Sequence, residues 1–430
     1  MNKLKGIGWK TASAIVIANM IGTGIFTSLG FQLVSTSNTW SIILLWVLGA
    51  IMALCGALSY AELGTHLTRS GGEYHFLSEI YHPLIGYLSG WVSLTVGFAA
   101  PVALAAMALG EYTGLYLGIS PTIIALLVSV LVTAFHSVSL NTSSRVQNVT
   151  TAIKILLIVG FIGSGFIVTP QISAFDWSSS WKEEILVPAY AVSFVYVTFS
   201  YSGWNAASYI VEEIKNVQRN LPKALILGTL IVSVLYLLLN LVFLRQGSAE
   251  ALSGQLEIGQ IVAINMFGDF GGKMISLAIA VMLISSISAM IWTGPRVTQV
   301  MAEDHKLWSW FAIKTKNAIP LRAIWLQTFI TILLILTGSF EQVLLYSGFV
   351  LQLFGALAVG AVFLIRKRGR YVEAFKSPFY PIPQIVFTLL SVWVLTYLLY
   401  NQPLETGFGM LNLAIGCLLY FANKFLYKTP

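Results

Sequence analysis

Long apolar segments separated by short polar loops run through the whole of this 430-residue sequence. A helix that crosses a membrane needs about 20 apolar residues, and the pattern therefore predicts an all-α membrane protein with twelve transmembrane helices. An amphipathic stretch over 246–271 is expected to form one or two short helices on the outer surface. The predicted spans cover residues 9–35, 40–66, 84–116, 121–139, 146–168, 186–212, 222–245, 272–302, 320–338, 341–366, 380–400 and 408–426.

Two of the apolar segments are interrupted by short polar runs, at residues 19–26 and 199–205. Non-helical backbone at membrane depth is tolerated only where protein or a water-filled cavity satisfies its polar groups. Broken helices at corresponding places in two halves of a chain indicate a transporter's binding site. The second interruption lies five spans after the first, as two inverted repeats of five helices require. We therefore predict a single domain, 1–430, with repeats at 9–168 and 186–366 and two extra helices at 380–426.

Composition and charge agree with this pattern. Hydrophobic residues make up 57% of the chain and charged residues 10%, with a mean hydropathy of +0.81, whereas soluble domains contain about 25% charged residues. If the N-terminus is cytoplasmic, 20 Lys and Arg residues fall on the inner side and three, Lys182, Arg245 and Lys273, on the outer side. This bias predicts that both termini are cytoplasmic. The net charge of +7 needs no nucleic acid, because it lies where anionic lipid attracts it.

Several function classes lack their characteristic residues. Cys55 and Cys417 both fall within predicted spans, so a disulfide framework is not expected. The five histidines are scattered without the spacing of metal ligands. The acidic residues lie mostly in loops, so we expect no two carboxylates to face each other inside the bilayer. We expect no enzyme, no metal and no cofactor.

The first interruption offers groups that suit an amino acid. Gly22 and Gly24 flank Thr23 and allow close backbone approach, and the amides at the start of the second half-helix suit a carboxylate. The first half-helix ends near Met20 and Ile21, whose carbonyls suit an ammonium group. The alternative is that these glycines only permit close helix packing.

The second interruption is expected to complete this site. Carbonyls of Phe199 and Ser202 would contact the same ammonium group, and Ser200 adds a hydroxyl. The Phe199 ring is a candidate gate that closes over the ligand. The alternative for Phe199 is an ordinary packing or lipid-facing aromatic residue.

Lys154 lies inside the fifth predicted span, and a lysine within a membrane indicates function. Snorkelling of the side chain to the interface is the alternative. A buried ammonium group needs acceptors, for which the candidates are carbonyls near Ala18 and Met20. Further candidate acceptors are the hydroxyls of Ser285, Ser286 and Ser288 in the eighth span. Together with Lys154 these residues would form a coupling site. The lysine would then occupy the place where a sodium-coupled carrier holds its ion.

The chain resembles the amino acid-polyamine-organocation superfamily, and within it the L-type amino acid transporters and their bacterial relatives. The resemblance spans nearly all 430 residues. It rests on Ile21-Gly22-Thr23-Gly24-Ile25-Phe26, Ala57-Leu58-Ser59-Tyr60-Ala61-Glu62-Leu63-Gly64, Ser70-Gly71-Gly72-Glu73-Tyr74, Arg145-Val146-Gln147 with Lys154, Tyr201-Ser202-Gly203-Trp204-Asn205, Glu212-Glu213 and Asn220-Leu221-Pro222.

The resemblance implies the LeuT-type fold of five plus five inverted helices, with helices 1 and 6 unwound around an α-amino acid. It implies a carboxylate site at Gly22, Thr23 and Gly24, an amino-group site at the backbone of Met20 or Ile21 with Phe199 and Ser202, and a gate at Phe199. Lys154 aligns with the lysine of sodium-independent members.

Two departures from the family pattern refine the expectation. Animal L-type members join a glycoprotein heavy chain through a cysteine between helices 3 and 4, and residues 118–121 contain none, so no obligatory subunit is expected. Members specialised for acid resistance or cationic substrates often carry an acidic residue just after the broken sixth helix, where this chain has Asn205. Neutral substrates are therefore favoured.

We predict a sodium-independent transporter of small to medium neutral L-amino acids such as alanine or serine, acting by alternating access as an exchanger in a prokaryotic plasma membrane. The predicted cavity is lined by backbone, hydroxyl and apolar groups without a free acid. Proton-coupled symport and a nutrient sensor built on the same fold are the alternatives. A channel would show rings of polar residues along a pore, and no repeated polar stripe is visible.

Overall fold

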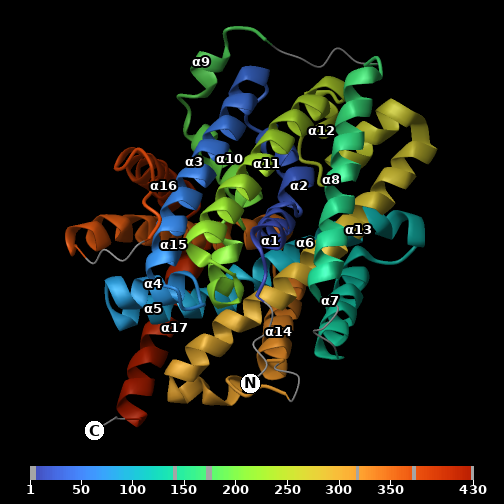
Figure 1. The fold of residues 1–430 in the computed structure, drawn as a ribbon. Coiled ribbons are helices and arrows are strands. Elements are labelled where there is room, and N and C mark those ends of the chain that lie inside the picture. Colours follow the sequence, from blue (N-terminus) through green and yellow to red (C-terminus); the bar gives the residue numbers. More distant parts are fainter. Residues whose placement is uncertain (1–5, 139–142, 171–176, 316–318, 370–373, 428–430) are drawn as a thin grey trace.

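The computed structural model describes residues 6–138, 143–170, 177–315, 319–369 and 374–427, and the elements in these ranges are helical (Figure 1). The helices are α1 Trp9–Met20, α2 Gly24–Gln32, α3 Thr39–His66, α4 Glu73–Ile80, α5 Pro83–Val92, η1 Ser93–Gly97, α6 Ala99–Leu117, α7 Pro121–Val138, α8 Ser143–Ile167, α9 Trp181–Glu184, α10 Pro188–Tyr201, η2 Ala206–Glu213, α11 Val217–Gln246, α12 Ala249–Leu252, α13 Ile258–Asp304, η3 Lys306–Phe311, α14 Leu321–Thr337, α15 Phe340–Lys367, α16 Ile382–Asn401 and α17 Pro403–Leu426.

Within the described residues, eight helical segments are long and apolar enough to cross a membrane. The segment Trp9–Gln32 combines α1 and α2, and Pro83–Gly114 runs from α5 through η1 into α6. Three further apolar helices are shorter, at Pro121–Ser137, Thr151–Ile167 and Leu321–Thr337. The chain is a multi-pass membrane protein.

Both predicted interruptions are breaks in the structure. α1 ends at Met20 and α2 begins at Gly24, while α10 ends at Tyr201 and the 3₁₀ helix η2 begins at Ala206. The polar run lowers helical stability at each point, and Gly203 has a positive φ of 95° that a helix does not contain. The predicted outer segment is also helical, as α12 and as the part of α13 before its kink at Gly268.

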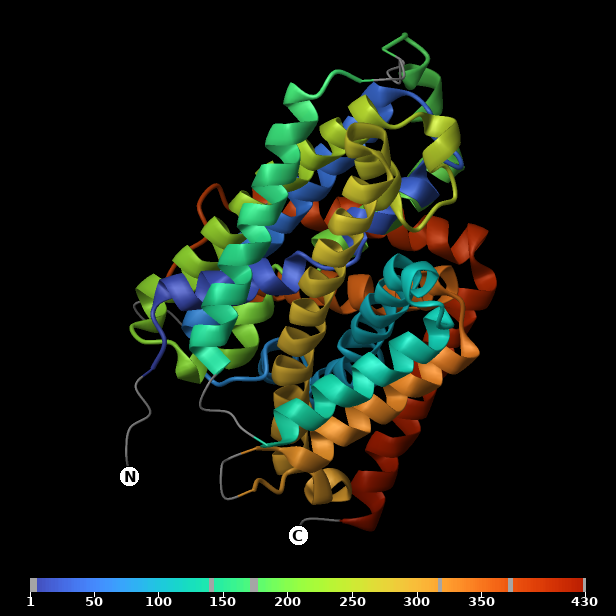
Figure 2. The ribbon, with the colours of Figure 1, turned by 90° about the vertical axis from the view of Figure 1, so that its right-hand side faces the viewer.

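The broken helices lie at the centre of the molecule. α1 packs against α8, α11 and α13, and α2 packs against α10. Most of the first apolar segment, Trp9–Gln32, is buried inside the protein, whereas most of α17 is not. Figure 2 accordingly shows α17 along the outside of the bundle. The core surrounds the two breaks, so their polar groups are shielded from lipid.

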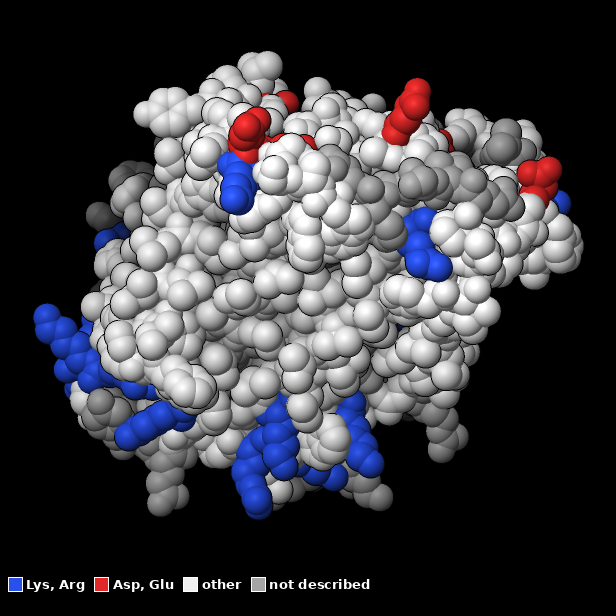
Figure 3. Space-filling model, turned by 90° about the horizontal axis from the view of Figure 1, so that it is seen from above, with Lys and Arg blue, Asp and Glu red and all other residues white. Residues whose placement is uncertain are grey.

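Both ends of the described chain lie at the lower end of Figure 1, opposite α9. This agrees with the prediction that the two termini share one side. Figure 3 views the α9 end, most of which is uncharged, with the larger groups of Lys and Arg near its margin. Of the basic residues counted on the inner side, Lys3, Lys5, Lys316, Arg370 and Lys428 lie outside the described residues.

Candidate functional site

The two breaks cross each other at close range. A Cβ atom on Gly24 would lie 2.4 Å from the Cα atom of Ser200, so α2 and α10 meet there without room for a side chain. A Cβ atom on Gly203 would lie 2.7 Å from the carbonyl carbon of Asn19. The glycines therefore bring the backbone of one break against the other. This geometry is compatible both with glycines that only permit close helix packing and with glycines that form part of a binding site.

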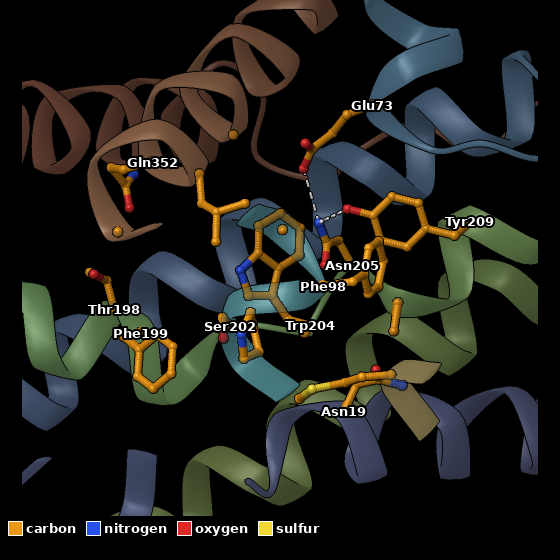
Figure 4. Close-up of a pocket in the computed structure, with 18 of the residues that line it drawn as sticks. Asn19, Glu73, Phe98, Thr198, Phe199, Ser202, Trp204, Asn205, Tyr209 and Gln352 are labelled. Atoms are coloured by element: carbon orange, nitrogen blue, oxygen red, sulfur yellow. Dashed lines mark hydrogen bonds between the residues drawn. The ribbon is translucent and has the colours of Figure 1, made fainter. Parts of the chain in front are cut away.

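A cavity of about 120 Å³ opens beside this crossing (Figure 4). This volume is well above the 10–15 Å³ that one water molecule needs. Asn19, Phe199, Ser202 and Asn205 from the two breaks form one part of the wall. The rest of the second break and the helices on either side of it add Thr198, Gly203, Trp204, Ala206 and Tyr209. Other parts of the chain add Glu73, Gly97, Phe98, Pro101, Met290, Gly348, Leu351, Gln352, Gly355 and Phe387.

Most of the predicted substrate residues line a smaller recess next to this cavity. The recess shares Asn19, Pro101, Phe199, Ser202 and Met290 with the larger space. Its remaining wall comes from Ala105 and from the predicted residues Met20, Gly22, Thr23, Gly24 and Ser200. Amides in the first turn of a helix have no partner in their own helix, so the start of α2 presents donors at this recess.

The carbonyls of the first half-helix already have partners. Met20 O accepts a hydrogen bond from Tyr236 Oη on α11, at 2.5 Å. Ile21 O accepts from Lys154 Nζ at 3.1 Å and from Ser286 Oγ at 2.8 Å, and Ile21 does not line the recess. Met20 therefore fits the predicted ammonium site better than Ile21, although the Tyr236 hydroxyl shares its oxygen.

The second break also combines packing and exposure to the cavity. Phe199 lines both spaces with 7% of its surface exposed, and its carbonyl accepts the Ser202 amide at 2.9 Å. Ser200 Oγ lies 2.8 Å from both Ser28 Oγ and Tyr196 O, so its single hydroxyl proton has two possible acceptors. Ser200 thus contributes mainly to the contact between α2 and α10, whereas Phe199 and Ser202 line both the recess and the larger cavity.

Lys154 is buried and bridges two helices from α8. Its Nζ atom donates to Ala18 O at 3.4 Å, Ile21 O at 3.1 Å and Ser286 Oγ at 2.7 Å, and 1% of the residue is exposed. Snorkelling is therefore not its role in this conformation. The ammonium group ties the end of α1 to α13, as the coupling hypothesis requires.

Two of the three predicted hydroxyls do not contact the lysine. Ser285 Oγ is buried without a hydrogen-bond partner among the described residues, and Ser288 Oγ bonds His136 Nε2 on α7 at 2.7 Å. Residues one and two positions apart on a helix face different directions, so only Ser286 meets Lys154. The predicted acceptor Met20 O is replaced by Ile21 O.

Sequence reasoning missed the carboxylate in the cavity wall. Glu73, at the start of α4, is the one charged residue among the described residues that line the larger cavity. Its Oε1 atom accepts hydrogen bonds from Tyr60 Oη at 2.6 Å and from Asn205 Nδ2 at 3.0 Å. Burial raises the pKa of the Glu73 carboxyl, and the hydrogen bonds from Tyr60 and Asn205 oppose that rise. The expectation of a cavity without a free acid was therefore wrong.

Three further residues near the breaks were missed, namely Tyr209, Gln352 and Tyr236. Asn205 Nδ2 donates to Tyr209 Oη at 3.1 Å, and Gln352 lines the cavity from α15. Tyr236 reaches the first break from α11. A sequence signal existed for Glu73, which directly follows Gly71 and Gly72 after a span. No group of three His, Cys, Asp or Glu side chains suited to a metal occurs in the described ranges.

Comparisons with known proteins agree with this geometry. The amino acid permease family profile matches residues 7–422. The b(0,+)-type amino acid transporter 1 of Rattus norvegicus is 30% identical over 97% of this chain and 87% of its own length. The serine/threonine exchanger SteT of Bacillus subtilis is 28% identical over 98% and 97%, and the large neutral amino acids transporter small subunit 2 of Oryctolagus cuniculus is 25% identical over 99% and 82%.

The match covers both breaks, Lys154 and nearly every described helix, and the relatives are amino acid transporters and not enzymes. The resemblance to the amino acid-polyamine-organocation superfamily is therefore confirmed, and this chain belongs to the amino acid permease family.

Proposed function

We propose that this protein is a sodium-independent transporter of small to medium neutral L-amino acids, working by alternating access as an exchanger. The observation that carries the proposal is the recess between the two broken helices, which is lined by Gly22, Thr23 and Gly24 from the first break and by Phe199 and Ser202 from the second. An amino acid has one anionic and one cationic group, and this recess offers backbone donors for the first and carbonyl and hydroxyl acceptors for the second.

The proposed architecture is twelve crossings in the LeuT-type arrangement, with repeats at 9–168 and 186–366. It is supported by breaks in the first and sixth predicted spans. The excess of Lys and Arg on one side supports cytoplasmic termini in a prokaryotic plasma membrane. The match to the serine/threonine exchanger SteT along nearly its whole length supports exchange of amino acids, and the absence of cysteine from residues 118–121 supports transport without a heavy-chain subunit.

Neutral substrates are favoured because the recess at the crossing is lined by uncharged residues. The Glu73 carboxylate lies in the adjoining cavity and not in this recess. In proteoliposomes, unlabelled alanine, serine and similar neutral amino acids are expected to suppress uptake of labelled alanine, whereas arginine, lysine and glutamate at equal concentration leave most of it. Competition by charged amino acids alone would contradict the assignment.

Sodium is not expected to support transport. The Lys154 ammonium group already supplies a fixed positive charge between the carbonyls of α1 and the Ser286 hydroxyl of α13. A second cation at that place would be repelled. Replacing sodium with choline on both sides of the vesicle should therefore leave alanine uptake unchanged, and a large fall in uptake would show that a sodium site exists.

A further inference from the structure

The Glu73 carboxylate is buried beside the cavity. It is 6% exposed, and no Lys, Arg or His side chain forms an ion pair with it in the described ranges. Both of its hydrogen bonds reach Oε1, and no described group donates to Oε2. A buried charge without a partner is costly, and a cation bound nearby would offset that cost.

Aromatic rings line the same cavity as this carboxylate. Phe98, Trp204 and Tyr209 line the same cavity, and the Phe98 and Tyr209 rings lie edge to face with centroids 5.3 Å apart. The Trp204 ring meets Tyr60 at 4.7 Å. Figure 4 shows Trp204, Asn205 and Tyr209 between Glu73 and the Asn19 end of the cavity. Aromatic faces attract ammonium groups, so a carboxylate among aromatic rings is suited to bind an amine.

Glu73 belongs to a different part of the protein from the recess. α4 follows the end of α3, and the Gly71 amide bonds Tyr209 O at 3.3 Å, which holds the start of α4 against η2. The cavity thus extends from the helix crossing at Asn19 and Phe199 to α4, the side that the proposed topology assigns to the cytoplasm. A ligand that leaves the recess toward α4 passes Glu73.

We propose that Glu73, with the rings of Phe98, Trp204 and Tyr209, forms a second binding site that takes the ammonium group of the amino acid between the recess and the cytoplasm. The site rests on the proposed transport function for its physiological ligand. Its chemistry requires only a primary ammonium group, because the carboxylate-binding amides of Gly22 to Gly24 lie in the recess. A simple amine is therefore a selective probe.

The test is calorimetric titration of the purified full-length protein with n-butylamine, which is cationic at neutral pH, with n-butanol and butyrate as controls. Binding of n-butylamine alone is expected, and Glu73→Gln should weaken it at least tenfold. The matched control is Glu79→Gln, which removes an exposed carboxylate from the same helix and should bind like the unaltered protein. Equal binding of n-butylamine by Glu73→Gln would overturn the proposal.

A second variant separates charge from structure. Tyr60→Phe removes the 2.6 Å hydrogen bond to Oε1 and leaves the carboxylate in place, so it should keep n-butylamine affinity within about threefold. If Tyr60→Phe loses binding as completely as Glu73→Gln, the cluster is a structural network and the proposed site is wrong.

Alanine uptake by the same preparations distinguishes this proposal from the proposed function. Normal alanine uptake without Glu73-dependent amine binding refutes the second site alone. Glu73-dependent amine binding in a protein that takes up no amino acid refutes the proposed function and the physiological ligand of the site.

Discussion

Replacing Lys154 with alanine is expected to slow amino acid exchange at least tenfold while changing substrate affinity by less than about threefold. The ammonium group bonds Ala18 O, Ile21 O and Ser286 Oγ, and none of these atoms belongs to a residue that lines the recess. The substitution removes the ammonium bridge between α1 and α13 and leaves Ala18 O without this donor, whereas Ile21 O keeps its hydrogen bond from Ser286 Oγ. A tenfold loss corresponds to about 1.4 kcal/mol in the activation barrier.

The measurement is the maximal exchange rate in proteoliposomes, beside equilibrium binding of labelled alanine to the purified protein. Ser286→Ala and Ser285→Ala form a matched pair on α13, because the first hydroxyl contacts Lys154 and the second has no partner among the described residues. Ser286→Ala should slow exchange, and Ser285→Ala should not. A Lys154→Ala protein that exchanges at the normal rate would show that the lysine is not a coupling residue.

Truncating Phe199 to alanine is expected to reduce affinity and net transport by about one to two orders of magnitude. The ring lines both the recess and the larger cavity, so its loss would leave the bound ligand open to solvent while the backbone of the break stays in place. Burial of an aromatic ring against a ligand contributes a few kcal/mol at most, which sets the size of the effect.

Phe199→Tyr should have a milder effect, because the ring area is kept. Phe329→Ala provides the control for loss of an aromatic residue, because Phe329 is 58% exposed on α14 and lines neither space. Membrane yield and thermal stability of the purified variants identify any misfolding. An alanine variant at Phe199 with normal yield, affinity and rate would leave this residue with a packing role alone.

The helices and the two breaks were predictable because each depends on local sequence. Apolar runs of sufficient length predict the spans, and the polar runs at 19–26 and 199–205 fall where the helices break. The burial of Lys154 also followed from its position within an apolar segment. Its contacts with Ala18 O and Ser286 Oγ are among those expected from the sequence.

The partners of these groups depend on how distant helices pack, which local sequence does not specify. From the sequence alone, three serines of α13 were equally good candidate acceptors for Lys154. In the structure, the orientation of α13 about its axis places Ser286 at Lys154 and Ser288 at His136. Glu73 appeared to belong to a loop. The contact between α4 and η2 brings it to the cavity, where Asn205 bonds it. Nothing in the local sequence distinguishes Tyr236 from the other aromatic residues. Its role depends on the packing of α11 against the first break.

Exchange itself is tested most directly in proteoliposomes that are either preloaded with unlabelled alanine or empty, with labelled alanine outside. In an exchanger, the binding site between the two broken helices moves back across the membrane faster when it carries an amino acid than when it is empty. Preloaded vesicles should therefore take up label severalfold faster than empty vesicles, and vesicles without protein should take up none. Equal uptake by preloaded and empty vesicles would contradict exchange, and no protein-dependent uptake in either would contradict amino acid transport.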